Sequence, residues 1–132
     1  MTQRFGIDTS ILVRLLTGDP ELEFTRCKQR LTALVEDDGA EVFASNQVIG
    51  EAYVAVQHHY GVSKEDCRAG LAAVLRSGLV APLGGDATLT ILGPTGGAGL
   101  LDRLIAADYV GAGLNVLTLD RKMAGLADTR LL

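Results

Sequence analysis

Residues 4–16 read Arg4-Phe5-Gly6-Ile7-Asp8-Thr9-Ser10-Ile11-Leu12-Val13-Arg14-Leu15-Leu16. Residues 4–8 predict a short buried strand that ends at Asp8. Thr9 or Ser10 is then expected to cap a helix, because apolar residues recur at helical spacing at positions 11, 12, 15 and 16. A strand that runs straight into an amphipathic helix indicates an α/β protein.

The same alternation continues along the chain. Further strands are predicted at 41–44, 79–81, 116–119 and 129–131, and further helices at 20–37, 45–59, 63–76, 100–110 and 122–126. Residues 88–92 form a β-branched stretch, and the glycine-rich residues 93–99 are expected to be loop. Alternating strands and helices predict a parallel sheet, in which residues 116–119 form a buried strand.

Composition limits the class of protein. The chain has 132 residues, of which 48% are hydrophobic, so we expect one folded domain spanning residues 1–132. No apolar stretch approaches 18 residues, so no membrane span is predicted. Residues 1–4 lack the pattern of a signal peptide, and the cytoplasm is the expected location. The net charge of −4 does not indicate a nucleic-acid binder.

Four acids stand out: Asp8 and Asp120 each follow a predicted strand, Asp102 opens a predicted helix, and Glu51 lies within another helix. The carboxyl ends of parallel strands meet at one edge of a sheet, where ligands gather. Four carboxylates at one place would repel one another unless a cation lay between them. Oxygen ligands of this kind suit Mg²⁺ or Mn²⁺. Taken singly, Asp8 and Asp102 are better interpreted as helix caps, Glu51 as a solvated side chain and Asp120 as the start of a turn; only the combination favours a metal site.

Four segments together resemble the PIN-domain nucleases, and in particular VapC-type toxins of bacterial toxin–antitoxin pairs. The segments are Ile7–Leu16, Val48-Ile49-Gly50-Glu51-Ala52, Leu101-Asp102-Arg103-Leu104-Ile105-Ala106-Ala107 and Val116-Leu117-Thr118-Leu119-Asp120-Arg121-Lys122. They occur in the family's order and cover nearly the whole chain. The resemblance implies a three-layer α/β/α sandwich around a central parallel sheet of four to five strands.

The resemblance also implies a function and a set of site residues. The function is an endoribonuclease that depends on Mg²⁺ or Mn²⁺ and hydrolyses RNA phosphodiester bonds. Asp8, Glu51, Asp102 and Asp120 carry over as the metal-binding and catalytic acids. Ser10 is expected to hold Asp8 in position, and Thr118 to hold Asp120, without either hydroxyl binding the metal itself. The glycine-rich residues 93–99 depart from the family pattern, which usually continues as helix before the third acid.

Partners follow from the same resemblance. Family members usually form homodimers and are neutralised by an antitoxin, here a cognate VapB-type protein. Arg14, Arg103 and Arg121 lie near the acids in sequence, so they are the expected contacts to RNA phosphates or to the antitoxin. Solvated surface positions are the ordinary alternative for these arginines.

Other classes fit the sequence less well. A receiver domain needs paired acids after its first strand, and a haloacid-dehalogenase-like phosphatase needs D-x-D where this chain has Asp8-Thr9-Ser10. Residues 93–99 lack the G-K-[ST] ending of a phosphate-binding loop. The main alternative is a catalytically silent PIN fold that binds RNA or protein.

Overall fold

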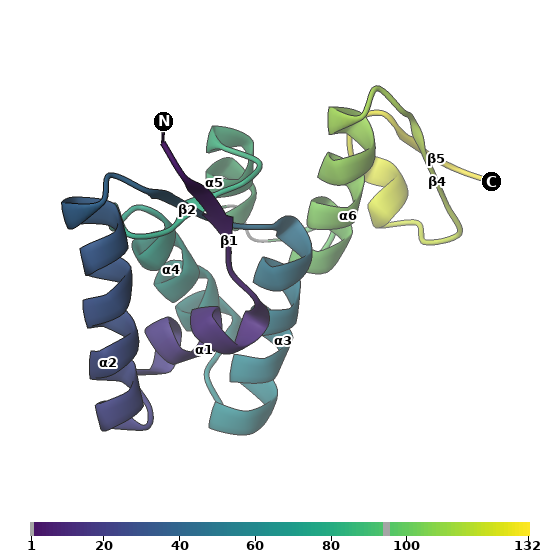
Figure 1. The fold of residues 1–132 in the computed structure, drawn as a ribbon. Coiled ribbons are helices and arrows are strands. Elements are labelled where there is room, and N and C mark those ends of the chain that lie inside the picture. The colour runs from purple at the N-terminus through teal and green to yellow at the C-terminus, as the bar shows by residue number, and fades with distance from the viewer. Residues whose placement is uncertain (1, 94–95) are drawn as a thin grey trace.

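The computed structural model describes residues 2–93 and 96–132 and shows an α/β protein (Figure 1). Its α-helices are α1 (Thr9–Thr17), α2 (Glu21–Thr32), α3 (Asn46–Tyr60), α4 (Lys64–Leu75), α5 (Asp86–Leu92) and α6 (Leu100–Gly111). Its strands are β1 (Arg4–Gly6), β2 (Glu41–Ala44), β3 (Ala81–Pro82), β4 (Val116–Thr118) and β5 (Thr129–Leu131). A π-helical turn, η1 (Ala33–Asp37), extends α2, and a 3₁₀ turn, η2 (Met123–Gly125), precedes β5. The glycine-rich loop prediction falls partly on residues 94–95, which lie outside the described residues.

Local capping signals account for several helix ends. Ser45 and Ser63 begin α3 and α4, because their hydroxyls accept hydrogen bonds from the backbone N–H groups of Val48 and Asp66. Gly18 and Gly61 end α1 and α3 in the left-handed conformation, which glycine adopts without steric cost. The cap predicted for α1 was wrong. Asp8 caps that helix instead of Thr9 or Ser10, since its carboxylate reaches two backbone N–H groups of the first turn.

The strands form two parallel sheets among the described residues. One has the order β1-β2-β3, with Phe5 opposite Val42 and Phe43 opposite Ala81. The other pairs β4 with β5, with Val116 opposite Thr129. In Figure 1 the β4–β5 sheet and η2 lie beside α6, away from the sheet that contains β1.

The main core lies between the three-stranded sheet and the helices. Leu12, Ile49 and Leu71 are completely buried in it, and Leu100 and Leu104 bring α6 into the same cluster. A much smaller cluster of Ala106, Val116 and Met123 holds the β4–β5 sheet against α6. The C-terminal sheet therefore rests on one helix and has little core of its own.

One expectation needs revision. Residues 116–119 were predicted to be a buried strand, but only Val116 is buried, whereas Leu117 is 57% exposed and Leu119 is 81% exposed. The reason is that a single helix covers one face of β4, and nothing in the described chain covers the other. Residues 88–92, to which the sequence assigned no element, belong to helix α5, where Thr88 and Leu92 are buried.

None of the described helices has both the length and the apolar character needed to cross a lipid bilayer.

Candidate functional site

Asp8 lies directly after β1, at the start of α1. One oxygen of its carboxylate accepts hydrogen bonds from the Ser10 hydroxyl at 2.5 Å, the Ser10 N–H at 3.1 Å and the Ile11 N–H at 3.4 Å. The Ser10 hydroxyl, followed by the Ile11 N–H, lowers the pKa of the Asp8 carboxyl below its ordinary value. Asp8 is thus an exposed carboxylate that stays ionised, with oxygen left free to bind a ligand.

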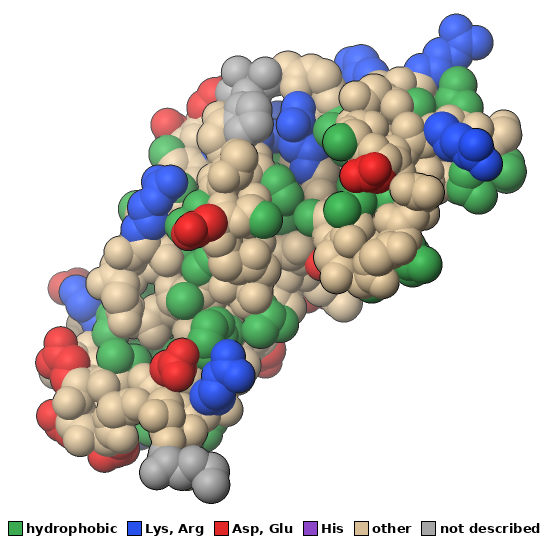
Figure 2. Space-filling view, turned by 90° about the horizontal axis from the view of Figure 1, so that it is seen from above, with side chains coloured by type: hydrophobic (Ala, Val, Ile, Leu, Met, Phe, Trp, Pro, Cys, Tyr) green, Lys and Arg blue, Asp and Glu red, His purple; other side chains and the backbone are tan. Residues whose placement is uncertain are grey.

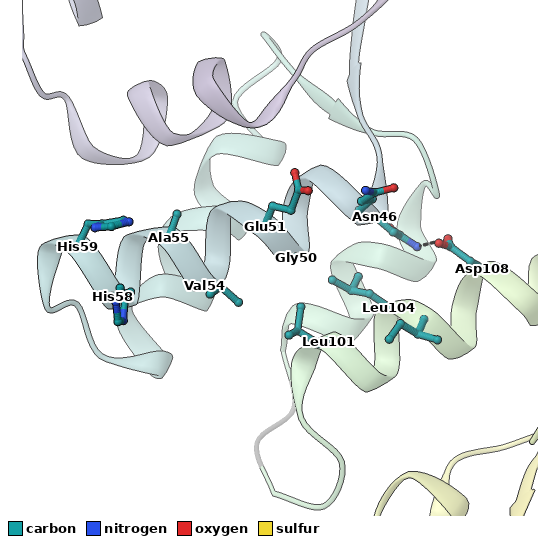
Figure 3. Close-up of a pocket in the computed structure, with 12 residues that line it drawn as sticks. Asn46, Gly50, Glu51, Val54, Ala55, His58, His59, Leu101, Leu104 and Asp108 are labelled. Atoms are coloured by element: carbon teal, nitrogen blue, oxygen red, sulfur yellow. Dashed lines mark hydrogen bonds between the residues drawn. The ribbon is translucent and has the colours of Figure 1, made fainter. Parts of the chain in front are cut away.

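Glu51 is the second acid of this region. It is exposed on α3, and its carboxylate accepts a hydrogen bond from the hydroxyl of Thr9 at 2.5 Å. Figure 3 shows the Glu51 side chain pointing from α3 toward α1 and away from Leu101 and Leu104 of α6. Since Thr9 follows Asp8 in the chain, this bond brings Glu51 beside the carboxyl end of β1. From the sequence, Thr9 was expected only as a helix cap, although its place directly after the first acid was the available signal.

Replacing Ser10 tests how the Asp8 charge is held. In Ser10→Ala, the pKa of Asp8 is expected to rise toward its ordinary value, because the largest stabilising hydrogen bond to the ionised form is lost. A lowered native pKa stabilises the fold above the unfolded-state pKa, and that contribution disappears as the pH falls through the native pKa. Ser10→Ala should therefore lose less stability on acidification than the wild type.

An NMR pH titration of the Asp8 carboxyl measures the change. Thr25→Ala is the matched control, because the Thr25 hydroxyl donates to the backbone oxygen of Glu21 and to no carboxylate. An unchanged Asp8 pKa in Ser10→Ala would contradict the assignment of the hydroxyl as its main partner.

A cleft of about 680 Å³ separates α3 from α6 (Figure 3). Glu51, Val54 and His58 lie on the α3 side, and Leu101 and Ile105 lie on the α6 side. Gly50 lets the two helices approach, because a Cβ atom at this position would stand 2.8 Å from Leu101 Cδ2. The cleft is mainly apolar, and Glu51 stands at its polar margin.

A polar network joins three elements at the base of this cleft. Asn46 donates from Nδ2 to Asp108 Oδ1 at 2.8 Å and accepts at Oδ1 from the Thr88 hydroxyl at 2.9 Å. Asn46 and Thr88 are buried, so each needs these partners. The network ties α3 to α5 and α6. The network was not predictable from the sequence, because its bonded residues are 42 and 62 positions apart and no local pattern links them.

Asp102 lies half-buried in the first turn of α6, where the helix dipole favours a negative charge. Its neighbour Arg103 donates from Nε to Ala98 O and from Nη2 to Gly96 O, both at 2.8 Å. Arg103 therefore braces the segment before α6. Arg14, the predicted contact residue that follows Asp8 in the chain, donates to Asp19 O at 3.4 Å.

Asp120 follows β4 in the C-terminal sheet. Its carboxylate accepts from the Met123 N–H at 2.8 Å, and its own N–H donates to the Thr118 hydroxyl at 3.0 Å. Both bonds shape the turn into η2. Since β4 lies beside α6 and away from β1 (Figure 1), Asp120 belongs to a different part of the molecule from Asp8. Within residues 2–93 and 96–132, no three Asp, Glu, His or Cys side chains lie close enough together to hold a metal ion.

The C-terminal end of the molecule combines basic and apolar side chains on one surface, as the right-hand end of Figure 2 shows. Exposed apolar residues of this end are Leu114, Leu117, Leu119, Leu131 and Leu132. Arg121, Lys122 and Arg130 are exposed in the same segment. A small monomeric protein rarely leaves so many large apolar side chains of one segment in water.

No protein-family model and no curated protein sequence matches this chain.

Proposed function

We propose that this chain is a metal-dependent endoribonuclease of the PIN type, a VapC-type toxin that hydrolyses cytoplasmic RNA and is neutralised by a cognate VapB-type antitoxin. The observation that carries the proposal is the Thr9–Glu51 hydrogen bond, which brings Glu51 beside Asp8 at the carboxyl end of β1. The ordered positions of Asp8, Glu51, Asp102 and Asp120 support it from the sequence.

The donor set suits a hard divalent cation. Mg²⁺ commonly uses one or two carboxylates and completes its octahedron with water and substrate phosphate. Asp8 and Glu51 are both exposed carboxylates, and Asp8 is held in its ionised form by Ser10. These two acids would supply the carboxylate ligands that such a magnesium site needs. Asp102 and Asp120 are the proposed remaining acids.

The residues of the chain have distinct roles in this reaction. Asp8 and Glu51 would hold the cation, and Ser10 and Thr9 orient their carboxylates through the hydrogen bonds at 2.5 Å. When bound, the cation supplies a water of lowered pKa and neutralises charge that develops on the phosphate. Arg14 and Arg121 would contact neighbouring RNA phosphates, while Arg103 holds the segment before α6 in place.

The fold proposed with this function is the PIN-like α/β/α sandwich with one central sheet of four to five strands. Both observed sheets are parallel, with three and two strands. Pairing of one edge strand from each sheet would therefore produce a sheet of five strands. The proposal also includes a homodimer, with the arginines available to the antitoxin.

A metal titration with RNA tests the function. Purified protein is expected to cleave a single-stranded RNA in Mn²⁺ or Mg²⁺, and to stop when EDTA removes the metal, because the two acids alone provide no nucleophile. Single-stranded DNA of the same sequence is the control substrate. RNA binding without cleavage at any metal concentration would favour the alternative, a catalytically silent PIN fold that binds RNA or protein.

A further inference from the structure

Each of the two sheets has an outer strand that can accept a further strand among the described residues. The outer strands are β1 and β3 in one sheet and β4 and β5 in the other. Pro82 in β3 lacks an N–H, which discourages further pairing at that edge. β1 and β5 each contain one arginine, Arg4 and Arg130, whereas β4 contains only Val116, Leu117 and Thr118 and no charged residue. An open strand of this kind is a template for another strand.

The hydrogen bonds show which backbone groups face each open edge. In β1, Gln3 O accepts from Glu41 N–H and Ile7 N–H donates to Phe43 O, both at 2.9 Å. Because backbone groups alternate sides along a strand, those of Gly6 point away from β2. In β4, Val116 N–H donates to Asp128 O and Thr118 O accepts from Leu132 N–H. The backbone groups of Leu117 therefore point away from β5.

These two edges are complementary in one parallel register. With Gly6 opposite Thr118, the Gly6 N–H meets Leu117 O and the Leu119 N–H meets Gly6 O, as a parallel ladder requires. The same register places Phe5, 39% exposed, beside Leu117, 57% exposed. Paired residues of neighbouring strands point to the same face of a sheet. Pairing would therefore bury both side chains and satisfy both rows of backbone groups.

The chain's own β4 is not placed to make this contact. Leu100 and Leu104 anchor α6 in the main core, and Asn46 bonds Asp108 on the same helix. Val116 and Met123 in turn hold the C-terminal sheet against Ala106 of α6. Swinging β4 onto the β1 of the same chain would break these contacts. A second copy of the chain requires no such loss.

We infer that two copies of this chain associate by pairing β4 of one copy with β1 of the other, reciprocally. Each half of the dimer then contains a five-stranded parallel sheet in the order β3-β2-β1-β4-β5, with β4 and β5 supplied by the other copy. Asp8 follows β1 and Asp120 follows β4, so the pairing brings Asp120 of one copy to the edge where Asp8 of the other lies. This last step rests on the proposed function, whereas the strand pairing does not.

A proline at position 6 tests the pairing directly. Gly6→Pro removes an N–H that points away from β2, and Gly6→Ala keeps it; a Cβ at this position meets nothing within 4 Å. By light scattering after size exclusion, wild type and Gly6→Ala are expected at twice the chain mass of 13.9 kDa, and Gly6→Pro at the chain mass. Far-UV circular dichroism verifies that all three fold. A monomeric wild type, or a folded Gly6→Pro that remains dimeric, overturns the inference.

Cross-linking distinguishes a second copy from closure within one chain. Phe5→Cys combined with Leu117→Cys is treated with a short bifunctional thiol reagent and run on a denaturing gel. The expected product is a covalent dimer. The control is Leu22→Cys with Leu117→Cys, since Leu22 is 59% exposed on α2 and lies outside β1; it should give little cross-linked dimer. A cross-link confined to single chains, or none, refutes the exchange.

Discussion

An Asp8→Asn variant is expected to cleave RNA about 100-fold more slowly than the wild type, or not measurably. A bound divalent ion stabilises transition-state charge by several kcal/mol, and about 2.7 kcal/mol corresponds to a 100-fold change in rate. An amide oxygen carries no charge, so it binds a hard cation far less strongly than the Asp8 carboxylate. The fold should survive, because asparagine caps helices about as well as aspartate.

The matched control is Asp38→Asn. Asp38 precedes β2, so it lies toward the amino end of the parallel strands, opposite the end where Asp8 follows β1. The same change of charge there should leave the cleavage rate within about twofold. Initial rates of RNA cleavage at saturating Mn²⁺ and the thermal unfolding midpoint are measured for all three proteins. Undiminished, metal-dependent cleavage by Asp8→Asn would remove this residue from the catalytic site.

A mixed dimer of two inactive chains is expected to recover about half of the wild-type activity per dimer. One chain carries Asp8→Asn and the other Asp120→Asn. If each site takes Asp8 from one copy and Asp120 from the other, one site of the mixed dimer contains both substitutions and the other contains neither. If each chain builds its own site, both sites are damaged and no activity returns. The mixed dimer is therefore active if the site is shared between copies and inactive if each chain builds its own site.

Co-expression with two different affinity tags, followed by two purification steps, isolates the mixed dimer. The homodimers of each variant measure the background. An inactive wild type would refute the proposed function and leave the strand pairing to be judged by the Gly6 variants. An active wild type whose mixed dimer stays inactive would refute the exchanged site while leaving the nuclease in place. The two failures are thus distinguishable.

Short-range chemistry explains why much of the secondary structure was predictable. Ser45 and Ser63 begin helices and Gly18 and Gly61 end them, as capping preferences and glycine's access to the left-handed conformation predict. Each of these signals acts within four residues along the chain. The cap of α1 was assigned to the wrong residue, because Asp8, Thr9 and Ser10 are all good caps and only the backbone geometry selects Asp8.

The sequence by itself determined the parallel α/β character, most of the helices and where the four acids stand along the chain. Tertiary structure alone decided that Thr9 hydrogen-bonds Glu51, that Asn46 links Thr88 to Asp108, and that β4 rests on α6 with Leu117 and Leu119 in solvent. The physical reason is how far apart along the chain the interacting residues are. Capping and periodicity depend on neighbours within a few residues, whereas the placement of a strand depends on which distant surface buries more apolar area and satisfies more backbone groups.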